Sequence, residues 1–333
     1  SRGTAVKNPT SVGFIGLGHV GSKLAHNLLA SGHPLAVLDL QREAAEPLLA
    51  AGATWGGDPR QLTQSVEVLI TCLPSPEASA AVLEQPDGVL AGLSQGQYWL
   101  EMSTTDSEEV RRLGRKVEER GASAADCPVS GGCHRAATGN IAIFAGCERA
   151  VFEAIFPVLS QMGQEILHTG GLGSASILKV LTNYLATANL VSLCEALVTA
   201  NGAGMDLATT YEAIRISSGN SFVHETESQV ILNGSRDINF TMDLVLKDIS
   251  LFQDLADQQG IPLELSPLLI EIFQDAAKRF GPREWSPNVI RRLEEATGSR
   301  ITAPGFPPEM VDHEPKAQAR EVLPRNRPSG TDA

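Results

Sequence analysis

A glycine pattern near the start of the chain constrains its fold more than any other feature. Residues 16–21 read Gly-Leu-Gly-His-Val-Gly, directly after the apolar run 12–15 and before an amphipathic stretch ending near Ser31. In a strand–turn–helix unit of this kind, the first glycine permits the tight turn, the second lets a ligand approach the backbone, and the third allows close helix–strand packing. The positive end of the helix then favours a pyrophosphate. The pattern therefore predicts a dinucleotide site.

Asp39 extends this prediction to the identity of the dinucleotide. It follows the next apolar run, 35–38. A carboxylate there accepts hydrogen bonds from ribose hydroxyls and repels a 2′-phosphate, so NAD is favoured over NADP. Arg42 is near enough to offset part of that repulsion. The predicted cofactor residues of this region are Gly16, Leu17, Gly18, His19, Val20, Gly21 and Asp39, and His19 is expected to line the loop without taking part in chemistry.

The first half of the chain alternates short β-rich runs with helical patterns, which is typical of a parallel sheet covered on both faces. We therefore predict an α/β fold that begins with a Rossmann-type doubly wound sheet domain over residues 1–172. The expected strands are 12–15, 35–38, 53–55, 68–73, 98–102, 123–126, 141–145 and 166–168.

After Gly173 the strand patterns end and an all-helical domain is predicted over 173–300. Its first helix, the interdomain helix 173–202, carries apolar residues around nearly its whole circumference, so we expect it to be buried. Further helices are expected at 206–217, 220–232, 241–259 and 267–280. Residues 301–333 form a proline-rich tail, interpreted as a linker-like or partner-wrapping arm.

Composition excludes several classes of partner. The 333 residues contain 26 Lys and Arg against 39 Asp and Glu, a net charge of −13, which argues against binding nucleic acid or an anionic membrane. The start of the chain lacks an apolar signal core, and we see no uncharged run long enough to span a bilayer. Five cysteines, an odd number, favour reduced thiols and a cytoplasmic location. No metal site is expected, since Cys127 and Cys133 lack partner ligands at suitable spacing.

Two further segments have the residue types of a reaction site. Ser130, Gly131 and Gly132 follow the strand at 123–126 and would present a hydroxyl and open amides suited to a carboxylate, although alone they are only a turn. Lys179 and Asn183, four residues apart, project from one face of the apolar helix. Burying a lysine is costly without a task, and burial lowers the pKa of an ammonium towards the range useful for proton transfer. The alternative is a lysine that extends to the surface.

Two weaker patterns lie in the helical domain. Lys247-Asp248 is, by itself, a solvated helix face. The segment 218–222 contains Asn220 and Ser221, which could hydrogen-bond extra substrate hydroxyls. The favoured interpretation of that segment is a helix stop followed by an N-cap.

In combination, the glycine turn, the Ser-Gly-Gly turn, Lys179 with Asn183, and Lys247 resemble the β-hydroxyacid dehydrogenase family over about 11–296. The resemblance implies that Leu73, Pro74 and Thr104 line the nicotinamide side. It further implies that Lys179 is the catalytic lysine, that Lys247 lies near the cofactor, and that the remaining matched residues bind substrate: Ser130, Gly131, Gly132 and Asn183. Val20 departs from the family's usual methionine, a change between apolar residues.

This resemblance leads us to expect NAD-dependent, reversible oxidation of a short, anionic 3-hydroxy acid, 3-hydroxyisobutyrate-like or more polar, with Lys179 as acid and base. One alternative is a semialdehyde or glyoxylate-type reductase. Another is an imine reductase using NADPH, but imine reductases of this fold generally lack the lysine. A non-catalytic dinucleotide sensor or scaffold is a third. The apolar helical domain and the resemblance also predict a homodimer or homotetramer.

Overall fold

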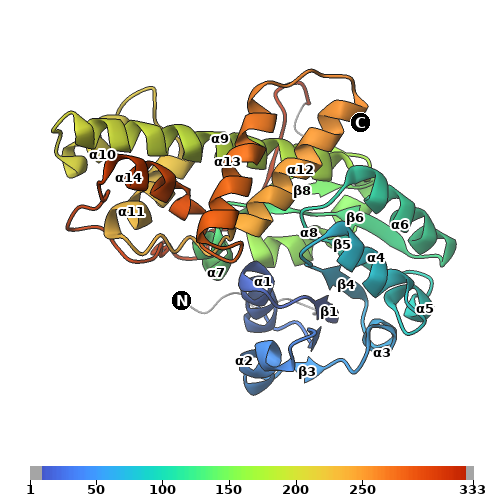
Figure 1. Cartoon of the computed structure of the whole chain (residues 1–333). Helices are drawn as coiled ribbons and strands as arrows, with labels where there is room; N and C mark the ends of the chain where they lie inside the picture. The colour runs from blue at the N-terminus through green and yellow to red at the C-terminus, as the bar shows by residue number, and fades with distance from the viewer. Residues whose placement is uncertain (1–9, 328–333) are drawn as a thin grey trace. The chain divides into compact units, whose positions relative to one another are not determined.

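The computed structural model describes residues 10–327 and divides into two compact units (Figure 1). The sheet unit runs through Lys179 and resumes at Asp312, and the helical unit comprises Val180–Val311. The division therefore falls inside the long helix and not at residue 173, and the predicted tail is split. The ends of the predicted domains, residues 1–9 and 328–333, lie outside the described residues.

The strands of the described chain form one mostly parallel sheet, in the order β10-β9-β8-β6-β5-β4-β1-β2-β3, with β7 paired to β8. Strands β1 to β6 run parallel, whereas β8 meets β6 antiparallel at the pair Asp126–Gly146, so β8, β9 and β10 run the other way. The Rossmann-type prediction is confirmed. The strands are β1 (Val12–Ile15), β2 (Leu35–Leu38), β3 (Thr54–Trp55), β4 (Val68–Thr71), β5 (Tyr98–Glu101), β6 (Ser123–Asp126), β7 (Val129–Ser130), β8 (Ile141–Gly146), β9 (Gly163–Gly170) and β10 (Arg320–Val322).

Helices cover both faces of this sheet because successive strand residues point to opposite sides. Phe14 packs on one face in a cluster with residues of α1 and α8, and its neighbour Ile15 packs on the other with residues of α3 to α6. The helices of the unit are α1 (His19–Ala30), α2 (Glu46–Ala50), α3 (Pro59–Gln64), α4 (Pro76–Glu84), α5 (Val89–Gly92), α6 (Ser107–Glu119), α7 (Cys133–Thr138) and α8 (Arg149–Met162).

The parallel strands place polar residues in one row. Thr71, Glu101 and Asp126 are the last residues of β4, β5 and β6, and they pair side by side in the sheet register. Ile15 at the end of β1 pairs with Thr71. The glycine turn and the loops after β4, β5 and β6 therefore emerge at the same edge of the sheet, where ligands bind in such folds.

The helical unit has its own apolar core, in which residues of several helices pack around Leu197, Ile249 and Phe273. Ser221 accepts a hydrogen bond from the amide of His224 and caps the start of α11, so the N-cap interpretation is confirmed. The helices are α9 (Ser174–Gly202, begun in the sheet unit), α10 (Leu207–Arg215), α11 (Phe222–Asn233), α12 (Met242–Gln258), α13 (Leu265–Phe280) and α14 (Arg291–Thr297).

The expectation that α9 is buried around its circumference is wrong for the single chain. Leu190, Leu193 and Leu197 belong to the helical core, but Leu181 and Leu185 are 39% and 51% exposed. Among the described helices, α9 is long and apolar enough to cross a membrane by length and composition, and 33% of its most apolar window is buried. A helix with one face in a protein core passes the same test.

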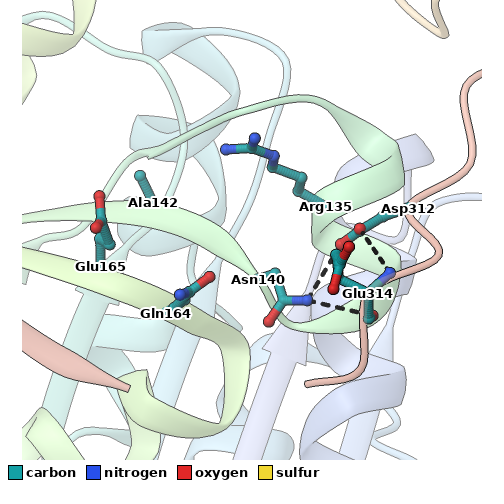
Figure 2. Close-up of a pocket in the computed structure, with 7 residues that line it drawn as sticks. All are labelled: Arg135, Asn140, Ala142, Gln164, Glu165, Asp312 and Glu314. Carbon is teal, nitrogen blue, oxygen red and sulfur yellow. Dashed lines mark hydrogen bonds between the residues drawn. The ribbon is translucent and has the colours of Figure 1, made fainter. Parts of the chain in front are cut away.

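The proline-rich tail also differs from the interpretation as a linker-like or partner-wrapping arm. From Asp312 it returns to the sheet unit, where Asn140 donates to Asp312 at 3.1 Å (Figure 2). Asn140 also donates to the carbonyl of Pro315 (3.0 Å) and accepts from the amide of Ala317 (2.8 Å). Strand β10 then pairs parallel with β9. Prolines lack a donor but keep a carbonyl acceptor, which Asn140 uses here.

Candidate active site

The glycine turn has the geometry that its spacing predicts. Gly16 has a φ of +104°, and a Cβ there would lie 2.1 Å from the carbonyl oxygen of Cys72. A Cβ at Gly21 would lie 2.2 Å from the carbonyl oxygen of Gly16. At Gly18, by contrast, a Cβ would meet nothing within 4 Å, and α1 begins directly after it with no side-chain cap. The turn thus leaves its space, and the open amides of a helix start, for an anionic group.

Asp39 is tied to this turn. One carboxylate oxygen accepts from the amide of Leu17 (2.7 Å) and the other from the amide of Gln41 (2.8 Å). Each oxygen keeps acceptor capacity for a ribose hydroxyl. Arg42 lies just beyond, with its guanidinium 4.7 Å from the ring centroid of Trp55. Leu40, directly after Asp39, is fully exposed, and the sequence already shows an apolar residue just past the end of this strand.

The Ser-Gly-Gly segment forms a turn between β7 and α7. Ser130 is held in β7 by pairing with Ala142 of β8. Gly131 and Gly132 have φ values of +133° and +87°, a region that side chains disfavour. Successive backbone amides in a turn of this kind can receive a carboxylate.

Lys179 lies near the start of α9, which a buried carboxylate of the sheet secures. Asp126 accepts hydrogen bonds from the amide of Gly173 (2.9 Å) and from the amide and hydroxyl of Ser176 (both 2.8 Å). Burial raises the pKa of the Asp126 carboxyl, and these hydrogen bonds oppose that rise. Lys179 follows one turn later and is only 8% exposed. The predicted catalytic lysine is therefore buried on a helix that the sheet fixes at its start.

In the helical unit, Asp248 joins two of the predicted site residues. Its carboxylate accepts from Nδ2 of Asn183 (2.6 Å) and pairs with Nζ of Lys247 (3.0 Å). Asp248 is 3% exposed. Sequence reasoning noted Asp248 without giving it a role, because its acceptor function depends on Asn183, which is distant in sequence. The carboxylate holds α9 and α12 together and orients the Asn183 amide.

The remaining predicted positions are distributed as follows. Leu73 and Pro74 lie in the loop after β4, and Thr104 lies in the loop after β5, both at the edge that carries the glycine turn. The five cysteines are free, and residues 10–327 contain no metal-binding cluster of His, Cys, Asp and Glu. The cavity in Figure 2, about 290 Å³, contains none of the predicted site residues. It is lined by Arg135, Asn140, Ala142, Gln164, Glu165, Asp312 and Glu314.

Two family models match the chain. The NAD-binding domain of 6-phosphogluconate dehydrogenase matches residues 11–170, and the NAD-binding domain of NADP-dependent 3-hydroxyisobutyrate dehydrogenase matches residues 173–293. Residues 294–333, with the docked tail, lie beyond both matches.

Individual relatives agree with these models. The chain is 32% identical to 2-(hydroxymethyl)glutarate dehydrogenase of Eubacterium barkeri, over 87% of this chain and 97% of the relative. It is 31% identical to the NAD-dependent L-serine dehydrogenase of Pseudomonas aeruginosa, over 86% and 98%. The structure of Psf3 in complex with NADP+ and 2-OPP is similar, with a TM-score of 0.79 and 28% identity over 85% of this chain and 99% of that one. The chain is therefore a member of the β-hydroxyacid dehydrogenase family, an NAD(P)-dependent oxidoreductase acting on CH–OH groups.

Proposed function

We propose that this enzyme reversibly oxidises a short 3-hydroxy acid to the semialdehyde or keto acid with NAD. One observation carries the proposal: Lys179 is 8% exposed, on a helix whose start is secured by Asp126 at the same sheet edge as the glycine turn. An amine sequestered in this way is suited to general acid–base catalysis. The substrates for which two relatives are named, a hydroxymethyl dicarboxylate and serine, support a 3-hydroxy acid.

The chain's own residues bind the dinucleotide and move one proton. The Gly16–Gly21 turn would hold the pyrophosphate of the dinucleotide and Asp39 its ribose, and the bound dinucleotide would accept the hydride from the carbinol carbon. Lys179 takes the proton of the substrate hydroxyl in the oxidation and returns it in the reverse reaction. The substrate carboxylate binds Ser130 and the Gly131–Gly132 amides. The sequence also assigns Asn183 to the substrate, and Asp248 orients the Asn183 amide.

The second candidate function is reduction of a semialdehyde, the reverse of the same reaction. The residues that hold and move the proton are the same in both directions. An NADPH-dependent imine reductase and a non-catalytic sensor are both less favoured. The reason is the buried Lys179: a sensor needs no proton-transfer group, and imine reductases of this fold generally lack the lysine.

The catalytic role is tested by Lys179→Ala. The kcat for hydroxy-acid oxidation should fall by at least about a hundredfold, since general acid–base catalysis contributes roughly 10²–10⁴. The dissociation constant of NADH, measured by fluorescence, should change little. Lys278→Ala, which removes an exposed lysine of α13, is the matched control and should leave kcat within about twofold. Near-normal turnover by Lys179→Ala would refute the assignment.

The preference for NAD is tested by Asp39→Ala. Removing the carboxylate removes both its ribose hydrogen bonds and its repulsion of a 2′-phosphate, leaving Arg42 nearby. The ratio of kcat/KM with NADP to kcat/KM with NAD should rise at least about tenfold, equivalent to about 1.4 kcal/mol. Asp87→Ala, an exposed loop aspartate, serves as control. An unchanged ratio would remove Asp39 from cofactor selection.

We also propose that the exposed apolar face of α9 in the helical unit is covered by a second copy of the chain. Leu181 and Leu185 are four residues apart, hence on one side of the helix, and both are exposed. Leu185→Glu would place a charge in that contact and should shift the assembly to monomer in analytical ultracentrifugation. The wild type sedimenting as a monomer at micromolar concentration would rule the contact out.

A further inference from the structure

A buried hydrogen-bonded network lies beneath the loops after β4 and β5. Its centre is Glu101, the last residue of β5, which is 1% exposed. Oxygen Oε1 of Glu101 accepts from the hydroxyl of Thr71 (3.0 Å), from the amide of Ser103 (3.1 Å) and from the hydroxyl of Ser103 (2.5 Å). The carboxyl therefore links the ends of two neighbouring strands.

The directions of these hydrogen bonds form a consistent chain. The indole nitrogen of Trp99 donates to the Thr71 hydroxyl (2.9 Å), which itself donates to Glu101. The amide of Leu73 donates to the Ser103 hydroxyl (2.8 Å), which likewise donates to Glu101. Each hydroxyl accepts one hydrogen bond and donates another, and both relays end on the same carboxyl oxygen. The arrangement fixes the rotation of both hydroxyl groups.

This network is costly to bury, so its presence requires an explanation. Burial raises the pKa of Glu101, and hydrogen bonds from Ser103 and Thr71 oppose that rise. The ion pairs of residues 10–327 do not include Glu101. An apolar residue at the end of a central strand would fill the core without that desolvation cost.

The network's two outer ends indicate its role. Leu73 begins the Leu73–Pro74 segment, and Ser103 directly precedes Thr104; these are the residues assigned to the nicotinamide side of the cofactor. We propose that Glu101 is a positioning residue for the dinucleotide, because its acceptor oxygen holds these two loops at a fixed separation through Thr71 and Ser103. This inference rests on the proposed function for the placement of the nicotinamide, but its test needs no substrate.

The acceptor role is tested with a set of variants and one readout, the dissociation constant of NADH from fluorescence. Ser103→Ala removes the hydroxyl that links the Leu73 amide to Glu101, and Glu101→Leu removes the carboxyl that accepts from Ser103 and Thr71. Both should raise the dissociation constant at least about tenfold, which corresponds to about 1.4 kcal/mol of lost binding free energy. Glu101→Gln keeps an oxygen acceptor of the same reach and should stay within about threefold of wild type.

The matched control is Ser228→Ala. Ser228 is fully buried in the helical unit and bonded to Nδ1 of His224 at 2.8 Å, so it tests the general effect of losing a buried serine. It should lower the melting temperature about as much as Ser103→Ala does, while the NADH dissociation constant stays within about twofold of wild type.

Three results would overturn the proposal. Ser103→Ala could bind NADH as tightly as wild type, or Ser228→Ala could raise the NADH dissociation constant as much as Ser103→Ala does. Equally, Glu101→Gln could raise that dissociation constant as much as Ser103→Ala does. If Glu101→Leu fails to fold, Ser103→Ala and Glu101→Gln decide the matter. Failure of the wild type to oxidise any hydroxy acid would contradict the proposed function and leave this binding test intact.

Discussion

The hydrogen bonds that the start of α9 donates to the Asp126 carboxylate are the interaction on which the proposed site depends. A helix start has amides with no partner within the helix, and Asp126 satisfies those of Gly173 and Ser176 from the end of a sheet strand. The helix is thereby fixed to the edge where the glycine turn and the loops after β4 and β5 emerge. Lys179 follows within one turn, so the buried carboxylate at the end of β6 determines where the amine lies.

Asp126 and Glu101 are both buried carboxyls that accept hydrogen bonds at the ends of neighbouring strands. They pair with each other in the register of β5 and β6, both are buried, and burial raises the pKa of both. Each accepts from backbone amides and hydroxyls instead of pairing with a cation. Asp126 secures a helix, and Glu101 secures two loops. These two buried carboxyls thus fix the start of α9, which carries Lys179, and the loops that carry Leu73 and Ser103.

Much of this structure can be predicted from patterns among neighbouring residues. The features that depend on contacts between residues distant in sequence cannot be predicted in this way. The glycine turn, the cap at Ser221 and most strands depend on residues within a few positions of each other, which spacing reveals. The docked tail was missed because β10 has only three residues and its partner, β9, is far away in sequence. The roles of Asp248 and Glu101 depend on partners in other elements. The exposure of Leu185 on α9 depends on which neighbours the fold supplies, and an apolar pattern does not specify them.

The most direct test of this account replaces the carboxylate that secures the lysine-bearing helix. Asp126→Ala should lower kcat for hydroxy-acid oxidation at least about tenfold while NADH binds within about twofold of wild type, because the start of α9 loses its partners and the glycine turn does not. The kcat of Asp126→Asn, which keeps one acceptor oxygen, should lie between those of wild type and Asp126→Ala. A folded Asp126→Ala enzyme with wild-type kcat would contradict the claim that Asp126 places Lys179.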